Sequence, residues 1–448
     1  MNRLWQMLKC LHLSRLWYLL AFVLTGLFVA AYFYWFLFDV ASAGLAIFAA
    51  ACTVDVYLLF RNPQAAGARR SLRYQRLSNG DNNEVTIAVN NGCSFPLKLR
   101  VIDELPVQLQ LRDFILVTHL AAGESRQFRY TVRPLQRGEY HFGNINLFFS
   151  SPLGLAERRI TVDASLSVPC YPSFLRLRQY QILAVGNRLS ELSQRKVRRI
   201  GHSMEFEQVE EYTRGNDIRK LNWKASARKN KLMVNHYTDE RAQTIYCVID
   251  MGRAMKMPFD GLTLLDYAIN ASLVLGHVAW IRQDKPGLIG FAEKVMFTVP
   301  ASRKGNQLLQ FQEALYHAAT NFEEPAFDKL LHHMQLVQRQ RSLLLMFTNF
   351  ESLSALKRQL RYLKKLASGH LLVLIFFENT ELTALLSKEA TQTLDVYEQA
   401  IAGKFELEKR QIAVELQRHG IITLYTPPSE LTINTLNKYL EVKTRGML

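Results

Sequence analysis

The sequence predicts three parts: an N-terminal hairpin of two transmembrane helices, an all-β sandwich, and a C-terminal α/β domain with a mostly parallel, doubly wound sheet. Two apolar runs open the 448-residue chain. Short stretches of alternating apolar and polar residues follow, and continuous apolar strands then alternate with helical segments. The predicted parts are residues 1–62, 63–172 and 243–448, with a linker and a basic segment over 173–242.

Residues 16–38 and 40–60 are apolar and long enough as helices to cross a bilayer core of about 30 Å, with Asp39 between them. Positive charges flank this pair but are absent from the turn, so both termini are predicted to face the cytoplasm. Asp55 lies inside the second run, where a carboxylate is expensive and often functional. The alternative is that it lies near enough to the end of the span to reach the headgroups. The flanking cations are Arg3, Lys9, Arg15, Arg61, Arg69, Arg70, Arg73 and Arg76.

The net charge of +16 favours an anionic partner: lipid, an acidic protein or nucleic acid, of which nucleic acid is the least expected because much of the charge flanks the membrane runs. The five cysteines form no CxxC pair and indicate neither a disulfide framework nor a zinc site. The sequence has no GxxxxGK[ST], GxSxG, HExxH or GxGxxG motif, so we predict no enzyme activity and assign no catalytic residue.

Residues 85–149 alternate with period two, and turn signals such as Asn90-Asn91-Gly92 and Arg137-Gly138-Glu139 separate the runs. Several short strands at this spacing predict the sandwich, which we interpret as a spacer or docking module.

From Gln243 onward, buried-looking strands alternate with helices, which predicts a parallel sheet. Ligands of such sheets bind beyond the carboxyl ends of the strands, where Asp250 would lie. The predicted strands are Thr244–Asp250, Gly287–Ala292, Ser342–Asn349, Leu371–Phe377 and Ile421–Tyr425.

The segment from Asp250 to Met255, together with Thr348-Asn349-Phe350, resembles a von Willebrand factor A-type domain. In that family an Asp-x-Ser-x-Ser loop, a Thr and a second Asp hold Mg²⁺, which binds a partner's carboxylate. This sequence keeps Asp250 but has Gly252 and Ala254 at the hydroxyl positions and Asn349 at the second acidic position. Because Mg²⁺ prefers hard oxygen ligands, we expect the fold without the family's metal chemistry, and no cofactor.

The stretch Glu211 to Val234 has seven Lys or Arg against two carboxylates, with Trp223 in the middle. Residues 214–217 predict a turn and residues 218–228 a short helix, on which Lys220, Lys224 and Arg228 would share a face. This pattern is typical of a contact surface, although Trp223 packing on the sheet, or cations facing anionic lipid, remain alternatives. The candidate partner-binding residues are Arg214, Asp217, Arg219, Lys220, Trp223, Lys224 and Arg228.

This stretch, EEYTRGNDIRKLNWKASARKNKLMV, resembles the signature of a bacterial membrane-protein family known as domain of unknown function fifty-eight. The resemblance implies an adaptor or scaffold in the bacterial inner membrane that works with MoxR-type AAA+ ATPases in protein assembly or maturation. Two alternatives stay open. One is a metal-dependent binding or catalytic domain centred on Asp250, and the other is an electrostatic scaffold on anionic lipid or nucleic acid.

Overall fold

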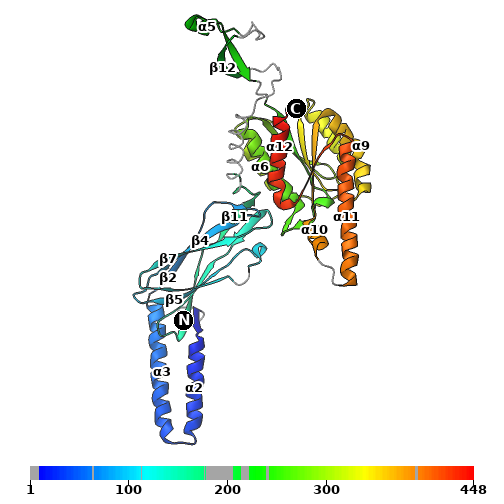
Figure 1. Cartoon of the computed structure of the whole chain (residues 1–448). Helices are drawn as coiled ribbons and strands as arrows, with labels where there is room; N and C mark the ends of the chain where they lie inside the picture. Colours follow the sequence, from blue (N-terminus) through cyan, green and yellow to red (C-terminus); the bar gives the residue numbers. More distant parts are fainter. Residues whose placement is uncertain are drawn as a thin grey trace. The chain divides into compact units, whose positions relative to one another are not determined.

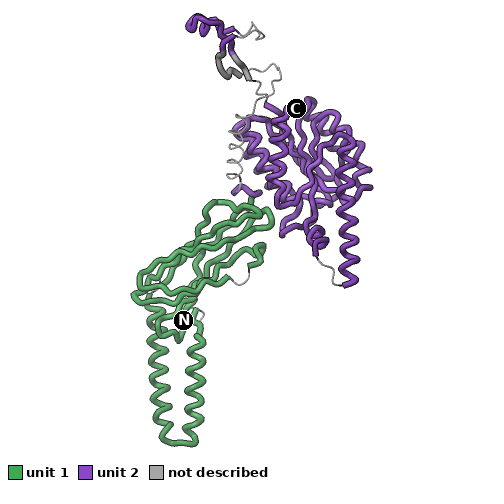
Figure 2. Tube along the Cα trace, in the orientation of Figure 1, with its two compact units in different colours: residues 1–171 green, residues 172–448 purple. Residues whose placement is uncertain are grey.

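The structure is a computed structural model, and it divides the chain into two compact units, Met1–Tyr171 and Pro172–Leu448 (Figure 2). Each unit has hydrophobic core clusters of its own. The residues that the structure describes are 10–62, 65–111, 114–175, 177, 205–212, 221–238, 242–388 and 392–447.

Two apolar helices, α2 (Arg15–Ala31) and α3 (Phe36–Arg61), lie side by side in the first unit (Figure 1). The Ser14 hydroxyl caps α2 by accepting the Trp17 N–H at 3.2 Å. The chain reverses at the aromatic turn of residues 32–35, so the predicted boundary at Asp39 is wrong. Asp39 lies in the first turn of α3, where a carboxylate interacts favourably with the helix dipole.

Among the residues that the structure describes, two helices have the length and composition needed to cross a membrane: α3 and α6 (Leu264–Ile281). The apolar window of α6 is 72% buried, because this helix belongs to the core of the second unit, whereas that of α3 is 11% buried. The α2 helix is apolar but shorter. Helix α3, with α2 beside it, is therefore the candidate for a membrane association.

The rest of the first unit is rich in β-sheet. A five-stranded sheet has the order β1-β10-β9-β5-β6, and two three-stranded sheets have the orders β2-β4-β7 and β3-β11-β8. One core cluster contains residues of β4, β5 and β9 together with Leu59 of α3, so the helical hairpin and the sheets share a core. The elements are β1 (Leu11–Leu13), β2 (Ala66–Leu72), β3 (Leu77–Ser78), β4 (Asn83–Asn91), β5 (Leu97–Asp103), η1 (Val107–Leu109), β6 (Ile115–Leu120), β7 (Ser125–Val132), β8 (Gly138–Phe142), β9 (Ile145–Ser150), β10 (Ala156–Val162) and β11 (Leu166–Tyr171).

The second unit contains a six-stranded sheet of order β18-β17-β14-β19-β20-β21, in which only β18 is antiparallel to its neighbour. The strands are β14 (Thr244–Asp250), β17 (Lys285–Phe291), β18 (Val295–Val299), β19 (Leu343–Phe347), β20 (Leu371–Phe377) and β21 (Ile422–Thr426). All five predicted strands occur, with ends shifted by a residue or two at three of them.

Helices cover both faces of this sheet (Figure 1). Alternate residues of β14 explain why: Ile245, Cys247 and Ile249 enter one core cluster, and Tyr246 and Val248 enter the other. The first cluster also takes residues of α6, α7 (Gln307–Tyr316) and α12 (Leu431–Thr444), and the second takes residues of α8 (Phe327–Val337), α9 (Leu353–Gly369) and α11 (Thr393–Arg418). The remaining elements among the described residues of the unit are β12 (Glu205–Glu211), α5 (Trp223–Lys229), β13 (Met233–Thr238), η3 (Arg253–Met255), β15 (Pro258–Phe259), β16 (Leu262–Thr263), α10 (Thr380–Ser387) and η4 (Pro428–Glu430).

Candidate functional site

Asp250 ends β14 at the carboxyl edge of the sheet, as predicted, and both of its carboxylate oxygens accept hydrogen bonds. The Thr348 hydroxyl donates to Oδ2 at 2.6 Å, and the Gly252 N–H donates to Oδ1 at 2.8 Å. Thr348 follows β19, the neighbouring strand, so parallel pairing places the two residues together. The carboxylate is 1% exposed and is held by the protein's own donors.

The residues at this edge fit a Mg²⁺ ion poorly. A Cβ added at Gly252 would lie 2.6 Å from Cδ of Pro325, so the backbone here leaves no room for the serine of an Asp-x-Ser-x-Ser loop. Ala254 supplies no side-chain oxygen. Within the described parts of the chain, no cluster of three His, Cys, Asp or Glu side chains could hold a metal ion. We therefore assign no role to a metal at Asp250.

A lysine ammonium group contacts Asn349, which stands at the position of the second acidic residue of the resembled family. Nζ of Lys409, which projects from α11, donates to Oδ1 of Asn349 at 2.6 Å and to the Phe350 carbonyl at 2.5 Å. The Asn349 amide donates in turn to the Ala254 carbonyl at 3.4 Å. Through these two hydrogen bonds the ammonium group of Lys409 joins α11 to the segment that follows β19. No pattern in the sequence indicated this contact, because Lys409 lies far from Asn349 along the chain.

Burial shifts the pKa of both charged groups at this edge. It raises the pKa of Asp250 to about 6, although the hydrogen bonds from Thr348 and Gly252 oppose the rise. Burial also lowers the pKa of the Lys409 ammonium to about 8, against the attraction of Glu351 and Glu406. Both groups are therefore easier to neutralise than their exposed counterparts.

The basic segment forms a small hairpin with a helix on it. Strand β12 pairs antiparallel with β13, and Asn222 caps α5 by accepting the Ala225 N–H at 3.0 Å. Several hydrogen bonds hold α5 and its cap to β13: the Asn222 N–H donates to the Met233 carbonyl and the Met233 N–H donates to the Ser226 hydroxyl, both at 2.8 Å, and the Asn222 amide donates to Oδ1 of Asn235 at 2.7 Å. The helix is therefore fixed on its strand, although it begins five residues later than predicted.

Trp223 opens α5 and is 71% exposed, while Lys224 and Arg228, one turn apart, are exposed beside it. The alternative in which Trp223 packs on the sheet does not match this exposure. We call the three residues the α5 surface. The other candidate partner-binding residues, Arg214, Asp217, Arg219 and Lys220, lie outside the described residues, so their grouping with the α5 surface stays a prediction.

Asp55 has a role that neither sequence interpretation foresaw. It is 0% exposed, and its carboxylate is buried against the β region rather than free at a headgroup. Oδ2 accepts the N–H groups of Leu155 and Ala156 at 3.0 and 2.8 Å, and Oδ1 accepts the Ser151 hydroxyl. Close by, Arg158 donates to the carbonyls of Leu59 and Asn62 at the end of α3. Asp55 is thus a joint between helix and sheet.

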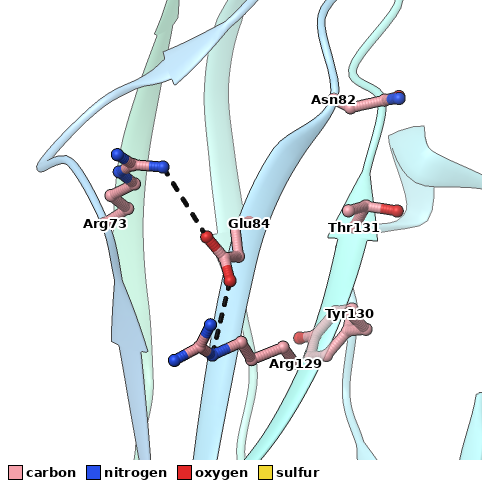
Figure 3. Close-up of a pocket in the computed structure, with 6 residues that line it drawn as sticks. All are labelled: Arg73, Asn82, Glu84, Arg129, Tyr130 and Thr131. Atoms are coloured by element: carbon pink, nitrogen blue, oxygen red, sulfur yellow. Dashed lines mark ion pairs between the residues drawn. The ribbon is translucent and has the colours of Figure 1, made fainter.

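A surface pocket of about 390 Å³ lies on the β region and is lined by Arg73, Asn82, Glu84, Arg129, Tyr130 and Thr131 (Figure 3). Glu84 lies between the two arginines, 3.8 Å from Arg73 and 3.5 Å from Arg129. The pocket's own carboxylate therefore neutralises part of its positive charge, and we assign it no ligand.

Behind the pocket lies a buried ion pair. Arg70 contacts both oxygens of Asp103 and also donates to the carbonyls of Ala164 and Gly143 at 2.8 and 3.0 Å. The Tyr130 hydroxyl donates to Asp103, and burial together with this carboxylate raises the pKa of the tyrosine. The network joins β2, β5 and β7 in the core.

Residues 208–415 match the model of a family described as "Protein of unknown function DUF58". The uncharacterized protein YeaD of Bacillus subtilis (strain 168) is 28% identical over 191 residues, which are 41% of this chain and 47% of that protein. The chain thus spans about half the length of the curated relative. The predicted resemblance to family fifty-eight is confirmed for residues 208–415.

Two solved structures resemble the chain weakly. The CARDB domain of a Pyrococcus furiosus protein is 14% identical with a TM-score of 0.17, and it covers 24% of this chain and 94% of its own. The bacterial hydrophobin BslA is 12% identical with a TM-score of 0.18, covering 24% of this chain and 95% of its own.

Proposed function

We propose that this protein is a membrane-anchored adaptor that docks a MoxR-type AAA+ ATPase, or a client of that ATPase, through the α5 surface. The match of residues 208–415 to the DUF58 family supports this assignment. The choice of a MoxR-type ATPase as the partner rests on the family resemblance found in the sequence. In this proposal the second unit is a von Willebrand factor A-like domain, which its parallel strands and the position of Asp250 at their carboxyl edge support.

The anchor in this proposal is the α2–α3 hairpin in a bacterial inner membrane. The exposed apolar side chains of both helices and the tyrosine and tryptophan residues of the turn at 32–35 support it, since such residues favour the membrane–water interface. Arg15 and Arg61 flank the hairpin at its open end and favour cytoplasmic termini. The second unit would then work on the cytoplasmic side.

One observation carries the docking role: Trp223 is exposed on a helix that the protein itself holds in place. A tryptophan fixed at a surface adds a large contact area at little entropic cost, and such residues dominate many interfaces. Lys224 and Arg228 add two cations at a spacing that suits an acidic partner. The internal contacts of Asp250 and Lys409 leave the α5 surface as the stronger candidate for recognition.

The test is co-purification of a AAA+ ATPase with the full chain from native membranes. We expect recovery of the ATPase to fall in a Trp223→Ala, Lys224→Ala, Arg228→Ala variant. The same loss is expected when Arg219→Ala replaces the lysine substitution. A Lys364→Ala, Lys365→Ala variant removes two exposed cations from α9 and is the matched control. Equal recovery from the folded triple variant and the control would contradict the role of the α5 surface.

A further inference from the structure

The long helix α11 carries an apolar face that the domain does not cover. The helix has 26 residues and is about 39 Å long. Ile412 and Leu416 in its C-terminal half are buried in the core, but its N-terminal half extends beyond the sheet (Figure 1). The side chains on this extension are exposed: Leu394 by 62%, Tyr397 by 66%, Ile401 by 42% and Phe405 by 48%.

These four residues are spaced by three, four and four positions, so they form one face of the helix, which we call the α11 stripe. The stripe continues the row that Ile412 and Leu416 bury. Helix α10 packs elsewhere, because Gln399 donates to the carbonyls of Leu385 and Lys388, and Leu386 lies against Gly403. The α11 stripe is therefore a core-like surface that α10 leaves uncovered.

The charge around the stripe is negative in a chain whose net charge is +16. Glu398, Lys404, Glu408 and Lys409 lie one turn from residues of the stripe, and the Lys409 ammonium is turned inward to Asn349, which leaves two carboxylates against one lysine. Glu398 lies one turn from both Leu394 and Ile401, and Glu408 lies one turn beyond Phe405. An apolar stripe with an acidic rim fits a basic partner segment that presents a large aromatic side chain.

The α5 surface of this same protein has that chemistry, with exposed Trp223 beside Lys224 and Arg228. We propose that the α11 stripe of one copy binds the α5 surface of a second copy, so that the protein associates head to tail. This inference rests on the proposed function in one respect: it gives the α5 surface a second ligand, which would compete with the ATPase.

Two features favour a second copy over other occupants. The hairpin of β12 and β13, which carries α5, precedes β14 in the chain and joins the domain at the amino end of that strand. The N-terminal half of α11 leaves the domain at the opposite, carboxyl edge, because α11 runs back to the start of β21. Contact within one chain would require the hairpin to fold back along the domain. An anionic membrane is disfavoured by the acidic rim. Because the two contact surfaces differ, the association is heterologous and can extend beyond a dimer.

The experiment measures the mass of the full chain in detergent micelles by sedimentation as a function of concentration, without any ATPase. We expect association that Ile401→Glu and Arg228→Glu each weaken at least tenfold. Glu398→Arg combined with Arg228→Glu should restore it, because the charges are exchanged. Leu407→Glu is the matched control: Leu407 is 56% exposed on the other side of α11 and should leave association unchanged.

A second measurement does not depend on the folding of any variant. Isotopically labelled and unlabelled wild-type chains are mixed and treated with a carbodiimide that couples lysine to glutamate. Links from Lys224 or Lys229 to Glu398 or Glu408 that join labelled to unlabelled chains support the proposal. It is overturned by a monomer at all concentrations, by links within single chains only, by an equal effect of Leu407→Glu, or by stripe variants that change only binding to phosphatidylglycerol vesicles. Failure of the wild-type chain to bind the ATPase, while its self-association persists, would contradict only the adaptor role.

Discussion

The carboxylate of Asp55 in α3 accepts the hydroxyl hydrogen of Ser151, a residue that follows β9 nearly one hundred positions later. Two backbone N–H groups, of Leu155 and Ala156, complete its bonds. The last turns of α3 are therefore seated in the β region, and Leu59 joins its core. An acidic residue inside an apolar helix thus joins the candidate anchor to the five-stranded sheet that contains β9 and β10.

The first prediction concerns this joint. Asp55→Ala leaves two buried N–H groups without an acceptor, which costs about 1–3 kcal/mol for each group. We expect faster amide hydrogen exchange in residues 151–156 of the full chain in detergent. Asp39→Ala is the control, since Asp39 is exposed in the same helix. Unchanged protection in Asp55→Ala, or an equal effect of both variants, would show that the joint does not hold the sheet.

The second prediction concerns Arg70 and Asp103. Asp103→Asn leaves a buried guanidinium without its counter-charge, and losing one partner of such a pair costs about 3–5 kcal/mol. The double variant Arg70→Met, Asp103→Leu should be more stable than the single one, because no unpaired charge remains. Hydrogen exchange of β5 and β7 measures both. Glu84→Gln, at the exposed pair, should change the free energy of opening of these strands by less than about 0.5 kcal/mol. A smaller effect of Asp103→Asn than of Glu84→Gln would contradict the prediction.

The third prediction is a pH dependence at Asp250. Its pKa is about 6 in the folded protein and 3.8 for an ordinary aspartate, so the folded state binds more protons between these values. Stability of the second unit should therefore fall as pH rises through this window and stay lower above it, by roughly 1–3 kcal/mol. Asp250→Asn, whose Oδ1 can accept the Gly252 N–H and whose Nδ2 can donate to the Thr348 hydroxyl oxygen, should remove the fall. Hydrogen exchange of β14 against pH decides this, and an identical pH profile in the variant would contradict it.

The fourth prediction concerns divalent cations. Because the Asp250 oxygens accept protein donors and Asn349 accepts the Lys409 ammonium, titration with Mg²⁺, Mn²⁺ or Ca²⁺ should release no saturable heat. The measurement is calorimetry of the full chain, with Asp250→Ala as the comparison. A saturable heat that Asp250→Ala abolishes would establish a metal site and contradict our reading of this edge.

The sequence predicted the α/β strands well because they are buried on both faces, and β14 and β20 have the predicted bounds. It placed the helix boundary at Asp39 because the true turn, residues 32–35, is aromatic and contains neither Gly nor Pro. Asp250 at the sheet edge was predictable from strand order. The partners of Asp55 and Lys409 were not, since both contacts join residues far apart in the chain through tertiary packing.

The proposed adaptor role requires that the α5 surface docks the ATPase. The most direct measurement is the affinity of the full chain in lipid nanodiscs for the purified MoxR-type ATPase. Three proteins are compared: the wild type, the triple variant Trp223→Ala, Lys224→Ala, Arg228→Ala, and the control variant Lys364→Ala, Lys365→Ala. We predict at least tenfold weaker binding in the triple variant, about 1.4 kcal/mol or more, and little change in the control. Equal affinity in all three proteins, or no binding by the wild type, would contradict it.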